Sequence, residues 1–234
     1  MTASQDRPAQ SYAFPQSSGR VSAASGVIAV VLLIVSFAVV GTDVPTYNDS
    51  SREFARFYAD KSSSIELSSL LGLFAGASFL WFIGYLHWSY GKAEQVARGY
   101  QRATPVAFGA AIAGVAVSLI FDAAREAAVV AQGTVEPGVV RAFDLFGGYL
   151  LSAAALLFGV FMFSSFFLIR VTKVLPAWLG YVALIGTLLG IVQALLLVAP
   201  QDDNGALGAL GYLWFLSFLV WTLGASAVLI KRAK

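Results

Sequence analysis

Six long apolar runs constrain the fold of this sequence more than any other feature. Each run reaches the roughly 20 residues that a helix needs to cross a hydrocarbon core of about 30 Å. Because lipid offers no partner for unpaired backbone groups, helices are the default structure for such runs. The runs cover residues 21–40, 65–88, 104–131, 143–169, 177–199 and 206–230. The sequence therefore predicts an all-α, polytopic transmembrane helix bundle with six spans.

The composition agrees with lipid as the solvent. Of the 234 residues, 58% are hydrophobic and 12% are charged, whereas a soluble domain carries about 25% charged residues. A net charge of +2 argues against the clustered basic face that nucleic-acid binding needs, so we expect no nucleic-acid partner. The chain has no cysteine and one histidine, His87, which excludes Cys-ligated or multi-His metal within one chain. We predict no metal site and no cofactor.

The first 20 residues are polar, rich in Ser, Gln and Pro, and typical of a disordered tail. The apolar run that follows exceeds the roughly 7–15 residues of a signal-peptide core, and no A-x-A-like cleavage site comes after it. We expect a retained helix rather than a cleaved leader.

Lysine and arginine are distributed unevenly between the two predicted sides of the bundle. A cytoplasmic N-terminus places ten basic residues inside and four outside, with Arg125 set aside within the third span. The inside residues are Arg7, Arg20, Lys92, Arg98, Arg102, Arg170, Lys173, Lys231, Arg232 and Lys234, and the outside ones are Arg52, Arg56, Lys61 and Arg141. Because basic residues favour the cytoplasmic side, we predict that both termini are cytoplasmic.

The first outer loop carries a helix signal of its own. Ser50-Ser51-Arg52-Glu53 fits a capping box, and Phe54, Phe57 and Tyr58 follow at helical spacing. The pattern predicts a short amphipathic helix that either lies on the outer membrane surface or caps the bundle. Interfacial anchoring is the simpler interpretation, and a lid over an outward cavity is the functional one.

A stripe of polar residues on the third span is the main candidate site. Ser118, Asp122, Arg125 and Glu126 fall on one side of that helix. Four polar residues from other spans, Arg141 among them, are expected at the same outer level. The candidate set includes the other three and treats Arg141 as a neighbour. The candidate ligand-binding residues are Asp122, Arg125, Glu126, Asp144, Glu66 and Gln193.

Intramembrane charges usually face protein or water, because a charge at mid-bilayer costs about 2.5–3.5 kcal/mol on insertion scales. The functional hypothesis is an outward-facing pocket in which the acids bind a cation, a proton or a polar headgroup and Arg125 is an anion anchor or internal counter-ion. Two other interpretations stay open. In the first, the charges are solvated at the membrane interface, because residues 104–121 alone are long enough to span. In the second, the charges form a structural ion-pair network.

The remaining motifs have simpler interpretations. His87, flanked by aromatic residues near the inner end of the second span, is typical of an interfacial anchor. Gly72-x-x-x-Gly76 and Gly186-x-x-x-Gly190 are small-residue patterns that allow close helix packing. Dense phenylalanine in the fourth span is typical of packing and lipid contact. No G-x-S-x-G, Walker A or dinucleotide motif is present, so we predict that the protein is not an enzyme.

The segment Lys173-Val174-Leu175-Pro176-Ala177-Trp178-Leu179-Gly180, with the Phe166-Phe167-Leu168-Ile169-Arg170 end of the preceding span, resembles a broad group of uncharacterised bacterial six-helix membrane proteins. The Leu-Pro-x-Trp-Leu-Gly element carries the resemblance. It implies a bacterial plasma membrane and no particular activity or site residues.

Three functions follow as hypotheses. The first is binding or translocation of a small polar molecule, an ion or a lipid headgroup through the outer pocket. The second is an accessory or assembly subunit that packs against another membrane protein or a second copy, with membrane lipids as further partners. The third is a lipid-acting membrane enzyme with Asp122 and Glu126 as acid and base, which we rank last because no nucleophile or metal set accompanies the two carboxylates.

Overall fold

The predicted six spans are confirmed. The structure, a computed structural model, describes residues 16–96, 103–195 and 206–233, without the side chains of residues 16–18 and 206–210. Within this part of the chain six helices are long and apolar enough to cross a membrane. They are α1 (Gln16–Val40), α3 (Ser62–Val96), α4 (Ala103–Ala131), α5 (Pro137–Thr172), α6 (Ala177–Leu195) and α7 (Ala206–Arg232). The chain is a multi-pass integral membrane protein.

Several helices extend beyond the apolar runs that predicted them. α1 begins at Gln16, inside the predicted tail, while α3 continues past residue 88 and α5 begins before residue 143. Hydropathy locates the hydrocarbon boundary, but a helix continues into the headgroup region as long as its backbone groups are satisfied. Pro137 at the first turn of α5 suits this position, since its missing N–H has no intrahelical partner there. Residues 1–15 and 196–199 lie outside the described residues.

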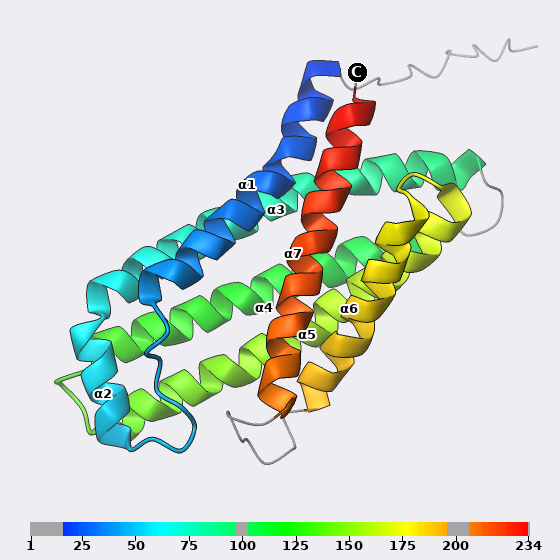
Figure 1. The fold of residues 1–234 in the computed structure, drawn as a ribbon. Helices are drawn as coiled ribbons and strands as arrows, with labels where there is room; N and C mark the ends of the chain where they lie inside the picture. The colour runs from blue at the N-terminus through cyan, green and yellow to red at the C-terminus, as the bar shows by residue number, and fades with distance from the viewer. Residues whose placement is uncertain (1–15, 97–102, 196–205, 234) are drawn as a thin grey trace, which may run out of the picture.

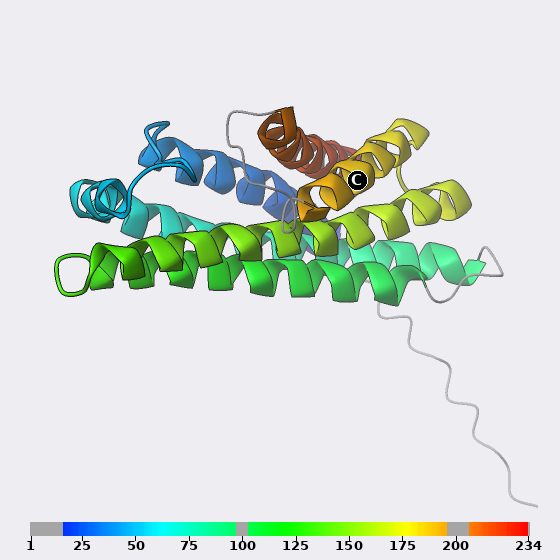
Figure 2. The same cartoon turned by 90° about the horizontal axis from the view of Figure 1, so that it is seen from below.

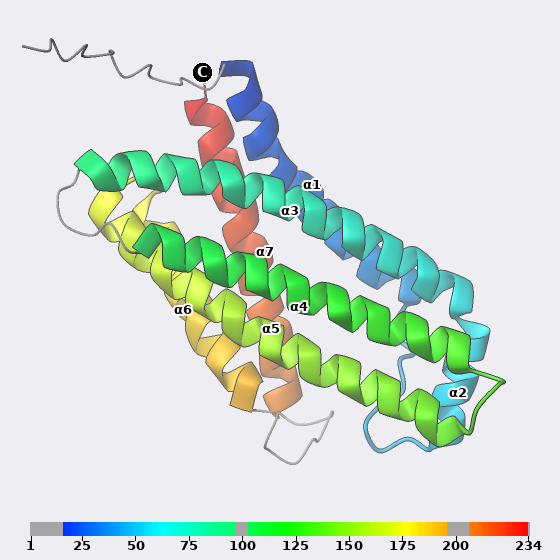
Figure 3. The ribbon, with the colours of Figure 1, turned by 180° about the vertical axis from the view of Figure 1, so that it is seen from behind.

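The six spans form a closed ring in which each helix packs against the next. The order around the ring is α1, α3, α4, α5, α6 and α7, and α7 packs in turn against α1. Seen from below, α3, α4 and α5 form one layer and α1, α7 and α6 the other (Figure 2). The view from behind shows the first layer in front, with its three long helices side by side (Figure 3).

Aromatic side chains fill the centre of this ring. Phe79 of α3 contacts Phe158 and Phe161 of α5 and Phe218 of α7, with ring centroids 5.9, 6.1 and 5.2 Å apart. Trp221 of α7 packs edge-on against Phe161. Such pairs add about 0.5–1.5 kcal/mol each beyond the area they bury. The centre is therefore a packed core and not a polar channel in the described part of the chain.

The two small-residue patterns predicted to pack closely do so. Gly76 lies against Val115 of α4, and Gly190 lies against the Ala155 carbonyl oxygen of α5 and Trp214 of α7. A methyl group added at Gly190 would lie 2.8 Å from that oxygen. The absence of a side chain lets α6 approach both neighbours at once.

The short amphipathic helix after the first span is confirmed as α2 (Ser51–Asp60), and it caps the bundle. Its capping box is complete, with the Ser50 backbone N–H donating to Glu53 Oε2 at 2.6 Å and the Glu53 N–H donating to Ser50 Oγ at 3.4 Å. Phe54, Phe57 and Tyr58 are buried against the ends of α3, α4 and α5. The apolar face of α2 therefore contacts protein.

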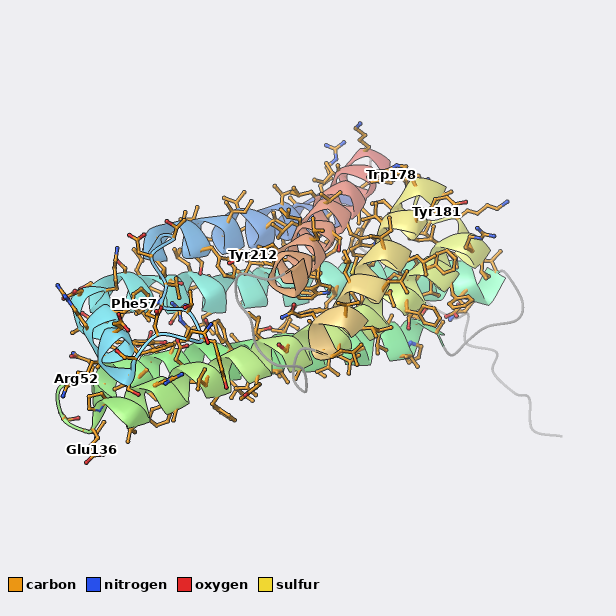
Figure 4. All side chains as sticks on the ribbon, turned by 60° about the horizontal axis from the view of Figure 1, so that its bottom comes forward. Arg52, Phe57, Glu136, Trp178, Tyr181 and Tyr212 are labelled. Carbon is orange, nitrogen blue, oxygen red and sulfur yellow. The ribbon has the colours of Figure 1, made fainter. Side chains whose placement is uncertain are left out.

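Both described ends of the chain lie at the end of the bundle opposite α2 (Figure 1). The Nε of Arg20 donates to the Ala233 carbonyl at 3.1 Å, which ties the start of α1 to the end of α7. In Figure 4, Arg52, Phe57 and Glu136 mark the α2 end, and Trp178 and Tyr181 lie at the other end on α6. An even number of spans requires this arrangement.

Candidate functional site

Three acidic side chains from two helices line one groove near the α2 end of the bundle. Glu66 comes from α3, and Asp122 and Glu126 come from α4, one helical turn apart. The groove is open and has a volume of about 320 Å³. Its other lining residues are Ser69, Leu70, Leu73, Leu119 and Ala123. Leu70 and Leu73 are half exposed, so the groove opens laterally beside an apolar surface.

Asp122 is seated against the backbone of the neighbouring helix. A methyl group at Gly72 of α3 would lie 2.7 Å from Asp122 Oδ2. The first glycine of the small-residue pattern therefore makes room for a carboxylate, which the sequence alone did not reveal. Along α4, Asp122 is about 14 Å and Glu126 about 7 Å from the end at Ala131. In a helix of about 43 Å centred on a 30 Å hydrocarbon core, Glu126 lies at the edge of the hydrocarbon and Asp122 lies deeper.

Polar atoms on the groove lining lack partners. Glu126 Oε1 and Ser69 Oγ are buried and have no hydrogen-bond partner among the described residues. Arg125 and Glu126 are the charged neighbours of Asp122. A buried acceptor without a donor is costly, by about 1–3 kcal/mol or more for a charged group. The groove therefore presents unsatisfied acceptors, which suits a ligand that donates hydrogen bonds or carries positive charge.

Arg125 and Asp144 belong to a different cluster, between α2, α4 and α5. Tyr58 Oη donates to Asp144 Oδ1 at 2.6 Å, and Arg125 interacts with the same tyrosine. The Arg125 guanidinium also lies 5.5 Å from the Phe121 ring centroid. We call Tyr58, Asp144 and Arg125 the clasp, since they connect α2 to α4 and α5.

The electrostatics of the clasp keep Tyr58 neutral. Burial raises the pKa of Tyr58 well above its ordinary value, and the charge of Asp144 and the hydrogen bond to it raise it further. Arg125 acts in the opposite direction, since a nearby cation favours the phenolate. Tyr58 is therefore the proton donor in its hydrogen bond at neutral pH.

Arg141 holds the loop that precedes α2. Its Nη2 donates to the Tyr47 carbonyl at 2.7 Å, and its guanidinium lies 5.9 Å from the Tyr47 ring and 5.6 Å from the Phe54 ring. Together with the clasp, this contact fixes α2 over the adjacent ends of α4 and α5.

Gln193 is separate from both clusters. Its Nε2 donates to Ser152 Oγ of α5 at 3.3 Å, and its Oε1 is buried without a partner. It lies in the contact between α5, α6 and α7. The structure thus brings together Glu66, Asp122 and Glu126 from the six candidate residues, places Arg125 and Asp144 next to Tyr58 instead, and leaves Gln193 apart.

His87 packs inside the protein more than an interfacial anchor would. Its ring lies 4.6 Å from the Phe108 ring of α4, and its Nδ1 is buried without a partner.

No family model, curated protein or solved structure matches this chain. The bacterial family suggested by the Leu-Pro-x-Trp-Leu-Gly element therefore stays a prediction. The local geometry of that element is nonetheless regular, because the Leu179 N–H donates to the Pro176 carbonyl at 3.0 Å as α6 begins.

Proposed function

We propose that this protein binds a cationic group, carried by a small molecule or a lipid headgroup, in the acidic groove between α3 and α4. The observation that carries the proposal is the convergence of Glu66, Asp122 and Glu126 on one open groove, while Arg125 interacts with Tyr58 in the clasp. Carboxylates without a full set of donors favour a cation. The proposed setting is a bacterial plasma membrane with both termini in the cytoplasm, so that the groove faces the outer leaflet.

An ammonium group is the cation that suits this groove best. It supplies three donors as well as a positive charge, which matches several acceptors spread along two helices. Leu70, Leu73 and Leu119 offer apolar contact at the same opening. An amine-bearing amphiphile, such as an aminophospholipid, satisfies both surfaces, while a free amine satisfies the acidic one alone.

Native mass spectrometry of the gently extracted protein tests the proposal. The protein is offered phosphatidylethanolamine, phosphatidylcholine or free ethanolamine in separate samples. We expect retained phosphatidylethanolamine in the wild type and at least a tenfold loss of it in Asp122→Asn/Glu126→Gln, since each charge-assisted contact contributes about 1.5–3 kcal/mol. Glu136→Gln is the matched control, because it removes an exposed carboxylate at the same end but outside the groove.

A second pair of variants tests the geometry instead of the charge. Gly72→Ala places a methyl group against the Asp122 carboxylate, whereas Gly84→Ala on the same helix meets no atom within 4 Å. Binding should fall in the first variant and persist in the second. Equal retention of lipid in all variants contradicts the proposal. A polypeptide that co-purifies would favour the accessory-subunit hypothesis, and turnover of the lipid by the wild type would favour the enzyme.

A further inference from the structure

The described charges of the molecule are divided between its two ends. Glu94 is the one acidic residue described at the end opposite α2, and it is 3% exposed and accepts a hydrogen bond of 2.6 Å from Thr104 Oγ1. The other described acidic residues lie towards the α2 end. The basic residues described at the end opposite α2 are Arg20, Lys92, Arg170, Lys173, Lys231 and Arg232. Among the described residues, this end therefore presents basic side chains without an exposed acidic one.

Two contacts with backbone carbonyls bring several of these cations onto one surface. Arg20 Nε on α1 donates to the Ala233 carbonyl, at the end of α7, at 3.1 Å. Arg232 Nη1 on α7 donates to the Lys173 carbonyl at 3.5 Å and to the carbonyl that follows it, in the turn between α5 and α6. Lys231 precedes Arg232 in α7, and all four basic side chains are exposed. We call Arg20, Lys173, Lys231 and Arg232 the basic cluster.

The basic cluster has no acidic partner among the described residues. The ion pair in this part of the chain joins Arg56 to Asp60, at the other end of the molecule. Arg20 uses its Nε and Arg232 its Nη1 for the carbonyl contacts, which leaves further N–H groups on each guanidinium. A guanidinium presents its donors in a planar fork that matches a phosphate group. Because like charges repel, an anion bound among these cations would lower the energy of the cluster.

The side chains beside the basic cluster suit a lipid better than a soluble anion. Val21, next to Arg20, is 66% exposed, and Trp178 and Tyr181 of α6 are 49% and 56% exposed at the same end of the bundle (Figure 4). The Trp178 ring lies against Gly224 of α7, on the surface between α6 and α7. Trp and Tyr side chains mark the headgroup level of a membrane protein. A phospholipid can place its phosphate on the cations and its acyl chains on the apolar surface, whereas a soluble phosphate uses the cations alone.

We propose that the basic cluster binds the headgroup of an anionic phospholipid. Charge complementarity selects this occupant, because a headgroup without an ammonium group keeps its negative charge, while the cation of a zwitterionic headgroup is repelled. Each Lys or Arg near an anionic lipid surface contributes about 1 kcal/mol, which is roughly fivefold in affinity. The acidic groove between α3 and α4 selects an ammonium group instead. The two sites therefore prefer opposite headgroups, and this proposal does not depend on the proposed function.

Native mass spectrometry of the full-length protein, titrated with phosphatidylglycerol or with phosphatidylcholine of the same acyl chains, tests the basic cluster. We expect the wild type to bind phosphatidylglycerol roughly tenfold more tightly or better, and Lys173→Gln/Lys231→Gln to lose this preference. Neither lysine side chain makes a described contact, so the fold should persist. Arg52→Gln/Arg56→Gln, which removes two exposed cations on α2, is the charge-matched control. Lys92→Gln removes an exposed cation at the same end as the cluster but outside it, and both controls should keep the preference.

Several results would overturn the proposal. Equal affinity of the wild type for the two lipids, or a preference that persists in Lys173→Gln/Lys231→Gln, would do so. A loss of the same size in Lys92→Gln would attribute the preference to diffuse positive charge, and displacement of the lipid by an equal concentration of soluble glycerol phosphate would assign the cluster to a free anion. Asp122→Asn/Glu126→Gln should keep the preference for phosphatidylglycerol while it loses phosphatidylethanolamine. Failure of this proposal is therefore distinguishable from failure of the proposed function.

Discussion

The clasp makes a quantitative prediction about how firmly α2 is held on the bundle. Tyr58→Phe removes one hydroxyl and keeps the ring, which packs edge-on against Phe57 with centroids 5.5 Å apart. The change therefore removes the hydrogen bond of 2.6 Å to the Asp144 carboxylate, together with the interaction of the hydroxyl with Arg125. Hydrogen bonds to charged groups contribute about 1.5–3 kcal/mol. A loss of that size corresponds to a roughly 10- to 150-fold change in an equilibrium constant.

Hydrogen exchange of the α2 amides measures this loss directly, because α2 can open without the spans unfolding. We expect exchange in α2 to accelerate by roughly 10- to 150-fold in Tyr58→Phe, with the spans unchanged. Arg56→Ala is the matched control on the same helix. It breaks the pair with Asp60 at 3.5 Å, in which the side chains are 84% and 65% exposed, and such pairs contribute about 0.5 kcal/mol or less. Unchanged exchange in Tyr58→Phe, or equal acceleration in both variants, would refute the clasp.

Three further outcomes follow from the structure. Gly190→Ala should destabilise the protein by about 1–3 kcal/mol, because the added methyl group meets a backbone carbonyl that cannot move aside. Gly148→Ala, whose methyl group meets no atom within 4 Å, should not destabilise it. Thermal unfolding compares the two variants. Because the folded state raises the pKa of Tyr58, its contribution to stability is present below about pH 10 and is lost as pH rises further; a Tm series on the alkaline side should show this loss in the wild type and a smaller one in Tyr58→Phe. Phe79→Ala should cost about 3–5 kcal/mol in a denaturant titration, because it opens a cavity at the centre of the ring.

The spans and the capping helix were predictable because each depends on local signals. A run of about 20 apolar residues or a capping box is complete within one short stretch of sequence. The ring order is also the simplest one, since consecutive helices pack against each other. The packing of α7 against α1 could not be predicted from the sequence, because it depends on tertiary contacts. The full lengths of α3 and α5 could not be predicted either, because both helices continue beyond the hydrocarbon core.

The candidate site was predictable in its residues but not in its grouping. Helical periodicity places Asp122, Arg125 and Glu126 on one side of α4, but it does not say which neighbouring helix each side chain meets. The structure turns Arg125 towards Tyr58 on α2 and seats Asp122 against Gly72 on α3. The partners that decide the chemistry come from helices distant in sequence, and no local pattern marks them. Tyr58 itself was predicted only as an apolar-face residue.

The position of the acidic residues bears on whether the proposed ligand would be bound or translocated. Aromatic side chains fill the centre of the helix ring. A polar species therefore has no prepared path there in the described part of the chain. The contact between α3 and α4 instead carries the acidic groove at one end and Glu94 at the other. Between them Gly76 packs against Val115, and the seam is apolar. Translocation would therefore require α3 and α4 to separate, whereas binding requires no such movement. The resting geometry favours a binding protein, and a flux assay in vesicles with Gly76→Leu, which would wedge this contact, distinguishes the two: unchanged flux would exclude the seam as a route.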